Sequence, residues 1–480
     1  MLFLRLAVCL LLACAELALG DLQSDVQKII SRSQLHGGTA GVCIVDPGSG
    51  EVLVNINANK SMIPASNQKL LTTGTALHVL GPSFAFRTKL VRNGDSLTII
   101  GDGDPTIGDT ELHGSVDWSK ENAELDAELM AWVNAVKKTG MKRIENLLVD
   151  DRIFDTNFVH PSWPSDQINN WYCAQVAGIN YHLNVVHFFP SPRLDARADL
   201  GDITPRMEWI SIGNKTSSNT GKKNRSSFWV ARLPNSNHMT ARGNVLTTHT
   251  TPVKVAFHDP PLVFGETFAS LLKKEGIPVK AVRRVHPAST TSGETIFIHK
   301  TPLQDALRRC NTDSHNLYAE SLLKRISASA TNRAGTFDEG ASVVENSVLQ
   351  RLGAYQPGLV ASDGSGMSRK NRIAPKTLAM WLASFNLHDQ VGKSLLDSLA
   401  TPGEGTLDNR FQNVDLKGAS VHAKSGYLRG VCALSGYILH EEHSPLVFSI
   451  IVNEIDGSVK GAKQMQEAIV SATIDYLNKK

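Results

Sequence analysis

Three apolar segments near the C-terminus constrain the fold more than any other feature of this chain. VHAKSGYLRG, VCALSGYIL and PLVFSIIVN together cover most of residues 421–453, and short turns separate them, so we expect three successive strands. A helical pattern follows, with Ile469, Thr473 and Tyr476 on one face. Because strands joined by short turns pair antiparallel, the end of the chain predicts an antiparallel sheet with a helix packed on it.

The rest of the chain predicts two kinds of structure. Residues 41–57 are typical of two strands around a Pro-Gly-Ser-Gly turn, and a helix is expected over residues 64–81. Short β-rich runs then continue to residue 298, after which helical periodicity returns. We therefore expect an α/β domain, an antiparallel sheet flanked by helices plus a helical lobe, built from residues 21–83 and 299–480, with a large β-rich insertion over residues 84–298.

Residues 1–20 have the pattern of a cleaved signal peptide. MLFLRLAVCLLLACAELALG places one Arg before an apolar core and ends in small residues. Lipid attachment at Cys14 is the competing interpretation, and the core is too short for a transmembrane anchor. The net charge of +3 includes no long run of like charges, so no nucleic-acid partner is expected. The mature protein is expected to be secreted or periplasmic.

Ser66 stands three residues before Lys69 at the start of the helix expected over residues 64–81. Residues i and i+3 share a helix face, so the hydroxyl and the amine can meet within one turn. A serine becomes a nucleophile when a neighbouring base takes its proton. Burial and the positive end of the helix both lower the pKa of a lysine, which suits it for that role. The pair therefore predicts a nucleophile with its base.

The spacing alone is not specific, because Ser270/Lys273 and Ser321/Lys324 repeat it. Both of these pairs fall in the middle of predicted amphipathic helices, where we expect solvated lysines. Lys138-Thr139-Gly140 is similarly ambiguous, but it follows a helical pattern, so we interpret it as a helix end.

Further groups decide between these pairs. An acyl-transfer site also needs a second hydroxyl, an amide for the substrate, and a cation beside a strand edge that can dock a peptide. Ser314 and Asn316 lie in a short loop between two predicted helices. Lys424-Ser425-Gly426 lies on the first of the C-terminal strands, where the glycine permits a close backbone approach. Ser66, and not the other two serines, has these groups in a consistent order.

The three motifs in this order resemble the Ser-x-x-Lys, Ser-x-Asn and Lys-Thr-Gly set of β-lactamases and penicillin-binding proteins. The wider sequence resembles one branch, the D-alanyl-D-alanine carboxypeptidase/endopeptidase family of low-molecular-mass penicillin-binding proteins. The segments that carry this resemblance are GDGDPTIGD, LLVDDRIFD, SDGSGMSRKNRIAP, GEGTLDNRF and AKSGYLRGVCALSGYI. The long stretch between Ser66 and Ser314 agrees with the large insertion of that family.

The resemblance implies a β-lactamase/transpeptidase-like fold and a serine-type enzyme that acts on peptidoglycan stem peptides and binds β-lactams, without cofactor or metal. It implies that Ser66 attacks the carbonyl of the penultimate D-alanine, with Lys69 as base and Ser314 as proton relay. The substrate-binding residues that it implies are Asn316, Lys424, Ser425, Gly426, Tyr427, Asp363 and Arg369.

Within that set, Asn316 would hold the substrate amide, and Ser425 would meet the terminal carboxylate beside the positive Lys424. The backbone N–H groups of Ser66 and Tyr427 would form the oxyanion hole. For Asp363 and Arg369, two roles stay open, since they either shape the cleft or brace its loop.

Three positions depart from the family pattern: His315 replaces Asp, Ser425 replaces Thr, and Tyr427 replaces a small hydroxyl residue. Ser425 keeps the hydroxyl, whereas Tyr427 would narrow the cleft or change which substrates fit. Two other functions are compatible with these motifs. One is a β-lactamase or esterase on the same scaffold, and the other is a binding homologue without turnover.

Two segments have compositions that suggest metal binding. His440 and His443 are three residues apart in a predicted turn, whereas metalloprotease histidine pairs lie four apart on a helix. Asp102 and Asp104 belong to GDGDP, but Ile107 occupies the place that an EF-hand loop gives to glycine. We therefore expect turns at both segments and no metal site.

Overall fold

The computed structural model describes residues 22–114, 116–194, 196–207, 209–220, 225–353, 356 and 358–479. The signal peptide predicted over residues 1–20 lies outside the described residues. Within the described part of the chain, no helix combines the length and the apolar character that crossing a membrane requires.

The chain divides into two compact units. Of the described residues, the first contains those of 22–78, 310–314 and 341–479, and the second those of 79–309 and 315–340. The two units are defined by compactness alone, which does not test where a catalytic domain begins and ends. The catalytic domain expected over residues 21–83 and 299–480 therefore stays a prediction.

The first unit holds the N-terminal and C-terminal elements of the chain, although α3 and α8 each extend past its boundaries. Its helices and strands are α2 (Leu22–Arg32), β1 (Thr39–Val45), β2 (Val52–Ile56), η1 (Ala65–Asn67), α3 (Gln68–Leu80), α8 (Phe337–Leu352), α9 (Pro375–Ala383), α10 (Gln390–Leu396), η4 (Gly405–Leu407), β13 (Ala419–Leu428), β14 (Val431–His440), β15 (Leu446–Asn453) and α11 (Lys460–Leu477).

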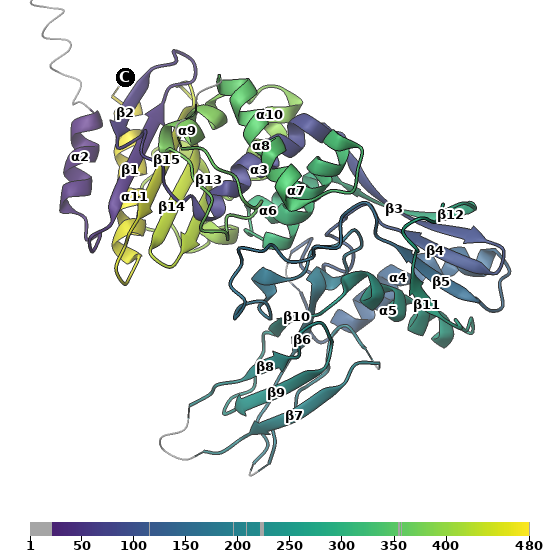
Figure 1. The fold of residues 1–480 in the computed structure, drawn as a ribbon. Coiled ribbons are helices and arrows are strands. Elements are labelled where there is room, and N and C mark those ends of the chain that lie inside the picture. Colours follow the sequence, from purple (N-terminus) through teal and green to yellow (C-terminus); the bar gives the residue numbers. More distant parts are fainter. Residues whose placement is uncertain are drawn as a thin grey trace, which may run out of the picture. The chain divides into compact units, whose positions relative to one another are not determined.

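The two ends of the chain build one antiparallel sheet in the first unit, in the order β13-β14-β15-β1-β2 (Figure 1). The predicted hairpin and the three predicted C-terminal strands are confirmed. The register is set by β1 against β15, where Val42 faces Ile450. β13 lies at one edge of this sheet, which leaves one side of that strand free of a neighbouring strand of the sheet.

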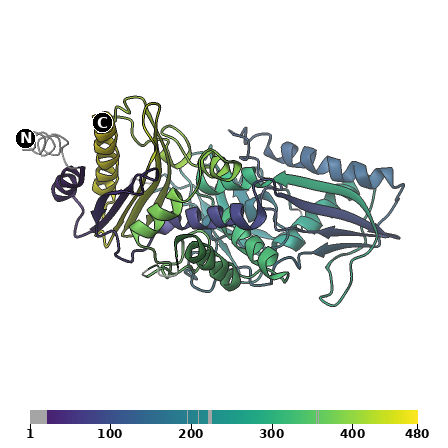
Figure 2. The ribbon, with the colours of Figure 1, turned by 90° about the horizontal axis from the view of Figure 1, so that it is seen from above.

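Helices cover both faces of this sheet (Figure 2). On one face α2 and α11 contact each other, and Val26 and Ile469 join a core with Val42 and Ile450 of the strands. On the other face α9 packs against β1 and β15. A strand buried on both faces needs apolar residues at successive positions, which explains why β15 reads LVFSIIVN and does not alternate.

The second unit is a mixed structure of sheets and helices. Its elements are β3 (Ala85–Asn93), β4 (Ser96–Ile100), α4 (Glu121–Lys138), β5 (Asn146–Asp150), η2 (Trp171–Cys173), η3 (His182–Asn184), β6 (Val185–Phe188), β7 (Ile212–Ser217), β8 (Trp229–Arg232), β9 (Met239–Asn244), β10 (Val253–Ala256), α5 (Pro260–Lys274), β11 (Val282–Arg284), β12 (Glu294–Pro302), most of α6 (Leu303–Asn311) and α7 (Asn316–Thr331).

The larger sheet of the second unit has the order β11-β5-β4-β3-β12. α4 connects the parallel strands β4 and β5, as a crossover between parallel strands requires. Trp132 of α4 packs with Phe264 and Phe268 of α5 in the core beside this sheet. Smaller sheets of the second unit have the orders β7-β9-β8 and β10-β6.

Candidate active site

Ser66 lies in a tight turn that runs directly into a helix. It occupies η1, and Lys69 lies in the first turn of α3, so the predicted helix is present but begins as a 3-10 turn. The preceding Ala65 is buried with a left-handed backbone (φ 48), which costs a non-glycine residue about 1–2 kcal/mol. A neighbouring loop holds this turn closely, since a Cβ on Gly366 would lie 1.8 Å from the Ala65 carbonyl oxygen.

Lys69 is completely buried and contacts the serine. Its Nζ donates to Ser66 Oγ at 3.2 Å and to the carbonyl of Ser365 at 2.8 Å. Thr72 ties the same loop to α3, because its Oγ1 donates to the carbonyl of Gly364 at 2.8 Å. The contact that the sequence spacing makes possible is therefore present, and the amine can exchange a proton with the hydroxyl.

Lys424 provides a second buried amine in the same unit. It lies on β13 with no exposed surface, and its Nζ donates to the carbonyl of Ser425 at 2.7 Å. Burial, and then the positive charge of Lys69, lower the pKa of Lys424 well below its usual range. Two ammonium groups in one buried site repel each other. The state in which one of the two amines is neutral is therefore favoured.

The strand that carries Lys424 approaches the turn that carries Ser66. A Cβ on Gly426 would lie 3.1 Å from the Ser66 backbone nitrogen and 2.9 Å from the Pro64 carbonyl oxygen, so this position requires glycine. Asn67 joins the two segments: in the orientation that satisfies both of its polar atoms, Nδ2 donates to the Lys424 carbonyl at 2.9 Å.

Asn67 also contacts β14 through Ser435, whose hydroxyl lies 2.7 Å from the Asn67 amide. Sequence reasoning missed both residues. The sequence does show a polar residue, Asn67, inside the Ser-x-x-Lys motif. Its partner Ser435 could not be foreseen, because it is 368 positions away along the chain.

The edge of β13 exposes the backbone groups that a peptide would need. The N–H of Ala423 donates to the carbonyl of Ala400 at 2.9 Å, so it points away from β14. Because backbone direction alternates along a strand, the N–H groups of Ser425 and Tyr427 point to the same free edge. Tyr427 is 61% exposed.

Ser314 and Asn316 lie in different compact units. Ser314 has a left-handed backbone (φ 62), and its loop is anchored to α3 because Asn311 Nδ2 donates to Thr73 Oγ1 at 3.1 Å. Asn316 begins α7 in the second unit, where its Nδ2 donates to the carbonyl of Tyr172 at 2.9 Å. The placement of Asn316 beside Ser66 stays a prediction.

His315, which replaces the usual Asp, packs among aromatic rings of the second unit. Its ring centroid lies 5.4 Å from that of Trp171 and 5.4 Å from that of Tyr318. An imidazole can make such tilted and edge-to-face contacts, whereas a carboxylate would lose its hydration there without a matching apolar contact. The substitution therefore suits its local environment.

Asp363 and Arg369 both contact backbone groups of the first unit. Asp363 is completely buried, and its two oxygens accept from the N–H groups of Gly366 at 2.8 Å and Ser368 at 2.6 Å. Arg369 donates to the carbonyl of Arg429, just beyond β13. These contacts favour the second of the two open roles for Asp363, the bracing of the loop that holds α3.

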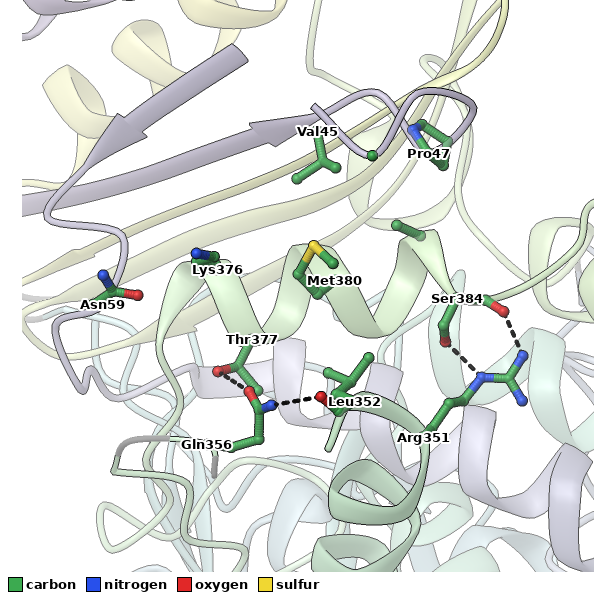
Figure 3. Close-up of a pocket in the computed structure, with 12 residues that line it drawn as sticks. Val45, Pro47, Asn59, Arg351, Leu352, Gln356, Lys376, Thr377, Met380 and Ser384 are labelled. Carbon is green, nitrogen blue, oxygen red and sulfur yellow. Dashed lines mark hydrogen bonds between the residues drawn. The ribbon is translucent and has the colours of Figure 1, made fainter. Parts of the chain in front are cut away.

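Pockets in the described part of the first unit include the following two. One, of about 250 Å³, has Arg369 and Arg429 in its lining. The other, of about 750 Å³, is lined by residues of α8 and α9, and none of the predicted site residues lines it (Figure 3). Arg351 closes one end of it by donating to Ser384 Oγ at 2.6 Å. The larger pocket is therefore not part of the candidate active site.

The alternative motifs have structural explanations. Lys138 ends α4 and Gly140 follows with φ 76, as expected for a helix end. Lys273 is exposed on α5, as expected. The expectation of a solvated lysine is wrong for Lys324, which is completely buried and donates to Asp155 at 2.7 Å. Periodicity along α7 did not show this, because the carboxylate comes from a distant part of the chain.

Comparison with known proteins identifies the family. Residues 22–474 match the D-Ala-D-Ala carboxypeptidase 3 (S13) family. The chain belongs to this family. It is 29% identical over 485 residues to a D-alanyl-D-alanine carboxypeptidase of Actinomadura sp. (strain R39), which covers 95% of this chain and 85% of the relative.

Solved structures show the same fold. Penicillin binding protein 4 (dacB) from Haemophilus influenzae has a TM-score of 0.77 at 21% identity, and the match covers 95% of this chain and 98% of that one. The same protein complexed with a novel β-lactam gives a TM-score of 0.70 at 22% identity over 95% and 99%. The predicted family, fold class and enzyme class, a serine-type D-Ala-D-Ala carboxypeptidase, are therefore confirmed.

Proposed function

We propose that this chain cleaves D-alanyl-D-alanine stem peptides of peptidoglycan through an acyl-enzyme on Ser66. Lys69 takes the proton of Ser66 Oγ while that oxygen attacks the carbonyl carbon of the penultimate D-alanine. Ser314 passes a proton to the leaving amine, and the C–N bond to the terminal D-alanine breaks. Water then hydrolyses the ester and restores the serine.

One observation carries this proposal: the buried amine of Lys69 lies 3.2 Å from Ser66 Oγ. A general base must lie within hydrogen-bonding reach of the proton that it takes, and this contact meets that condition. Burial and the neighbouring amine of Lys69 lower the pKa of Lys424 well below its usual range, so two ammonium groups together are disfavoured in this site.

The substrate would lie along the free edge of β13 as an added strand. The N–H groups of Ser66 and Tyr427 would hold the developing oxyanion, usually the largest single electrostatic contribution to such a reaction. Lys424 and Ser425 would hold the terminal carboxylate, and Asn316 the substrate amide. Gly426 would keep the strand close to the nucleophile, while Asp363 and Arg369 would brace the surrounding loops.

Two further features are part of the proposal. The relative from Haemophilus influenzae has a structure with a bound β-lactam, so we infer that this chain also binds β-lactams through Ser66. We also infer that residues 1–20 are a signal peptide and that the enzyme works outside the cytoplasm, where peptidoglycan is found.

Labelling with a fluorescent penicillin tests the proposed nucleophile. We expect a covalent adduct on Ser66, located by mass spectrometry, and no labelling of Ser66→Ala. Ser270→Ala is the matched control, because Ser270 also precedes a lysine by three positions but is exposed on α5. An adduct on another serine would refute the assignment.

The lifetime of the adduct separates the carboxypeptidase from a β-lactamase on the same scaffold. A carboxypeptidase should release D-alanine from a synthetic D-alanyl-D-alanine peptide while its penicillin adduct persists. Rapid release of hydrolysed penicillin without peptide cleavage would indicate the β-lactamase.

A further inference from the structure

Glu121, His182 and His187 form a buried cluster in the second unit, and each side chain is 1% exposed or less. Glu121 is the first residue of α4, His182 lies in η3, and His187 lies in β6. His182 Nε2 is 3.2 Å from Glu121 Oε1, and His187 Nδ1 is 3.0 Å from Glu121 Oε2. One nitrogen or oxygen atom of each side chain lies within 4.8 Å of the other two. None of the predicted motifs includes this cluster.

A neutral His182 ring cannot donate a hydrogen bond to both of its neighbours, the Val185 carbonyl and the Glu121 carboxylate. Nδ1 lies 2.8 Å from the carbonyl oxygen of Val185, which only accepts, so Nδ1 carries the proton. In a neutral ring Nε2 is then an acceptor, yet it faces a carboxylate oxygen that also only accepts. One additional proton or a metal ion must therefore lie between Nε2 and Glu121.

We propose that this cluster is a zinc site, with Glu121, His182 and His187 as ligands. Two imidazoles and one carboxylate are a ligand set that zinc takes in proteins. Tetrahedral zinc with bonds of about 2.0–2.1 Å holds neighbouring ligand atoms about 3.3 Å apart, close to the two distances above. One ion would supply the positive charge that the three groups share.

Neighbouring groups orient these ligands as the outer groups of metal sites do. A histidine that binds metal usually donates its other N–H to a carbonyl or carboxylate, as His182 does to Val185. The hydroxyl of Thr110 donates to Glu121 Oε1 at 2.9 Å and fixes the carboxylate. Two of the three ligands, His182 and Glu121, are thus held from outside the cluster.

The backbone around His182 is held in an uncommon conformation that turns the ring toward Glu121. His182, Leu183 and Asn184 all have left-handed backbones, with φ of 49, 55 and 57. Asn184 stabilises this turn, because its Nδ2 donates to the Gln175 carbonyl at 2.7 Å and its Oδ1 accepts from the Tyr181 N–H at 3.0 Å. Such conformations persist where the surroundings determine them, and they gather at binding sites.

The three side chains are closed to solvent and come from α4, η3 and β6. A bound ion would therefore join α4 to β6 and stabilise the second unit.

Metal analysis of the full chain tests this proposal. The protein is unfolded, stripped with a chelator, refolded with one equivalent of zinc and dialysed. We expect about one zinc per chain and a higher melting temperature than after refolding without metal. Glu121→Gln and His187→Gln should each lose at least tenfold in zinc content or affinity. His440→Ala is the matched control, because His440 and His443 are also neighbouring rings, 4.8 Å apart, and its zinc content should not change.

A milder variant covers the case in which the ligand variants fail to fold. Thr110→Val removes the hydroxyl that fixes Glu121 and should weaken zinc binding about tenfold, while Thr110→Ser should keep it. Wild-type protein that refolds normally but retains no zinc and gains no stability from it would overturn the proposal. In that case a second proton on His182 satisfies the cluster.

Discussion

The chain contains two buried lysines that each follow a serine by three residues, and their surroundings differ. Lys69 donates to the hydroxyl of Ser66 and to a backbone carbonyl, near the second amine of Lys424. Lys324 donates to the carboxylate of Asp155, and its amine also lies over the ring of Phe337, 4.2 Å from the centroid.

The difference shows that a position three residues after a serine and burial are together not enough to make a lysine a catalytic base. A carboxylate next to an amine stabilises the ammonium form, whereas a second amine opposes it. Burial lowers the pKa of Lys324, but Asp155 opposes that shift. For Lys424 burial and Lys69 act in the same direction. The comparison supports the proposed chemistry at Ser66 and Lys69, and it shows that Lys324 forms an ion pair with Asp155.

The largest expected effects come from removing each amine. Lys69→Met should lower the rate of acylation by penicillin by about a hundredfold to ten-thousandfold, because the general base is lost. Lys324→Met should instead lower the free energy of unfolding by about 3 kcal/mol, because Asp155 loses its buried partner. Stopped-flow acylation and urea unfolding of both variants measure this. Equal losses of acylation rate, corrected for folded protein, would remove the distinction.

Lys424 should matter more than the lysine of the competing Lys-Thr-Gly motif. Lys424→Ala should lower the acylation rate on the order of a hundredfold, as the loss of one preorganised electrostatic contact does. Lys138→Ala should leave the rate within a few-fold, because Lys138 is exposed at the end of α4. Similar losses in the two variants would mean that the motif was assigned wrongly.

The dependence of stability on pH should also reveal the buried amine of Lys424. Its pKa is lowered in the folded state, so between that value and about 10.4 the unfolded chain binds more protons. The free energy of unfolding contributed by Lys424 therefore rises with pH in that range. Lys424→Met should flatten this rise in urea titrations at alkaline pH, and Lys138→Met should not. A wild-type slope in Lys424→Met would contradict the assignment.

Ser321 gives the smallest expected effect. Its hydroxyl is buried and has no hydrogen-bond partner among the described residues. Ser321→Ala removes that unsatisfied group, so the free energy of unfolding should change by less than about 1 kcal/mol, in the stabilising direction. Labelling by penicillin should stay at the wild-type level. Loss of labelling would show that Ser321 takes part in the reaction.

Local patterns predicted the parts of this molecule that local physics determines. The strands of residues 421–453 and the contact of Ser66 with Lys69 follow from runs and spacings within a few residues. The ion-pair partner of Lys324 does not follow from a local pattern, because Asp155 is 169 positions away along the chain. The cluster of Glu121 with His182 was missed for the same reason, because the pair is separated by 61 positions and meets through tertiary folding.

The pH dependence of acylation tests the central claim most directly, namely that a neutral amine beside Ser66 takes its proton. Stopped-flow rates with a fluorescent penicillin, recorded from about pH 5 to pH 10, should rise through one ionisation below the ordinary lysine value of about 10.4. A rate independent of pH across this range, in a protein that stays folded, would contradict the account.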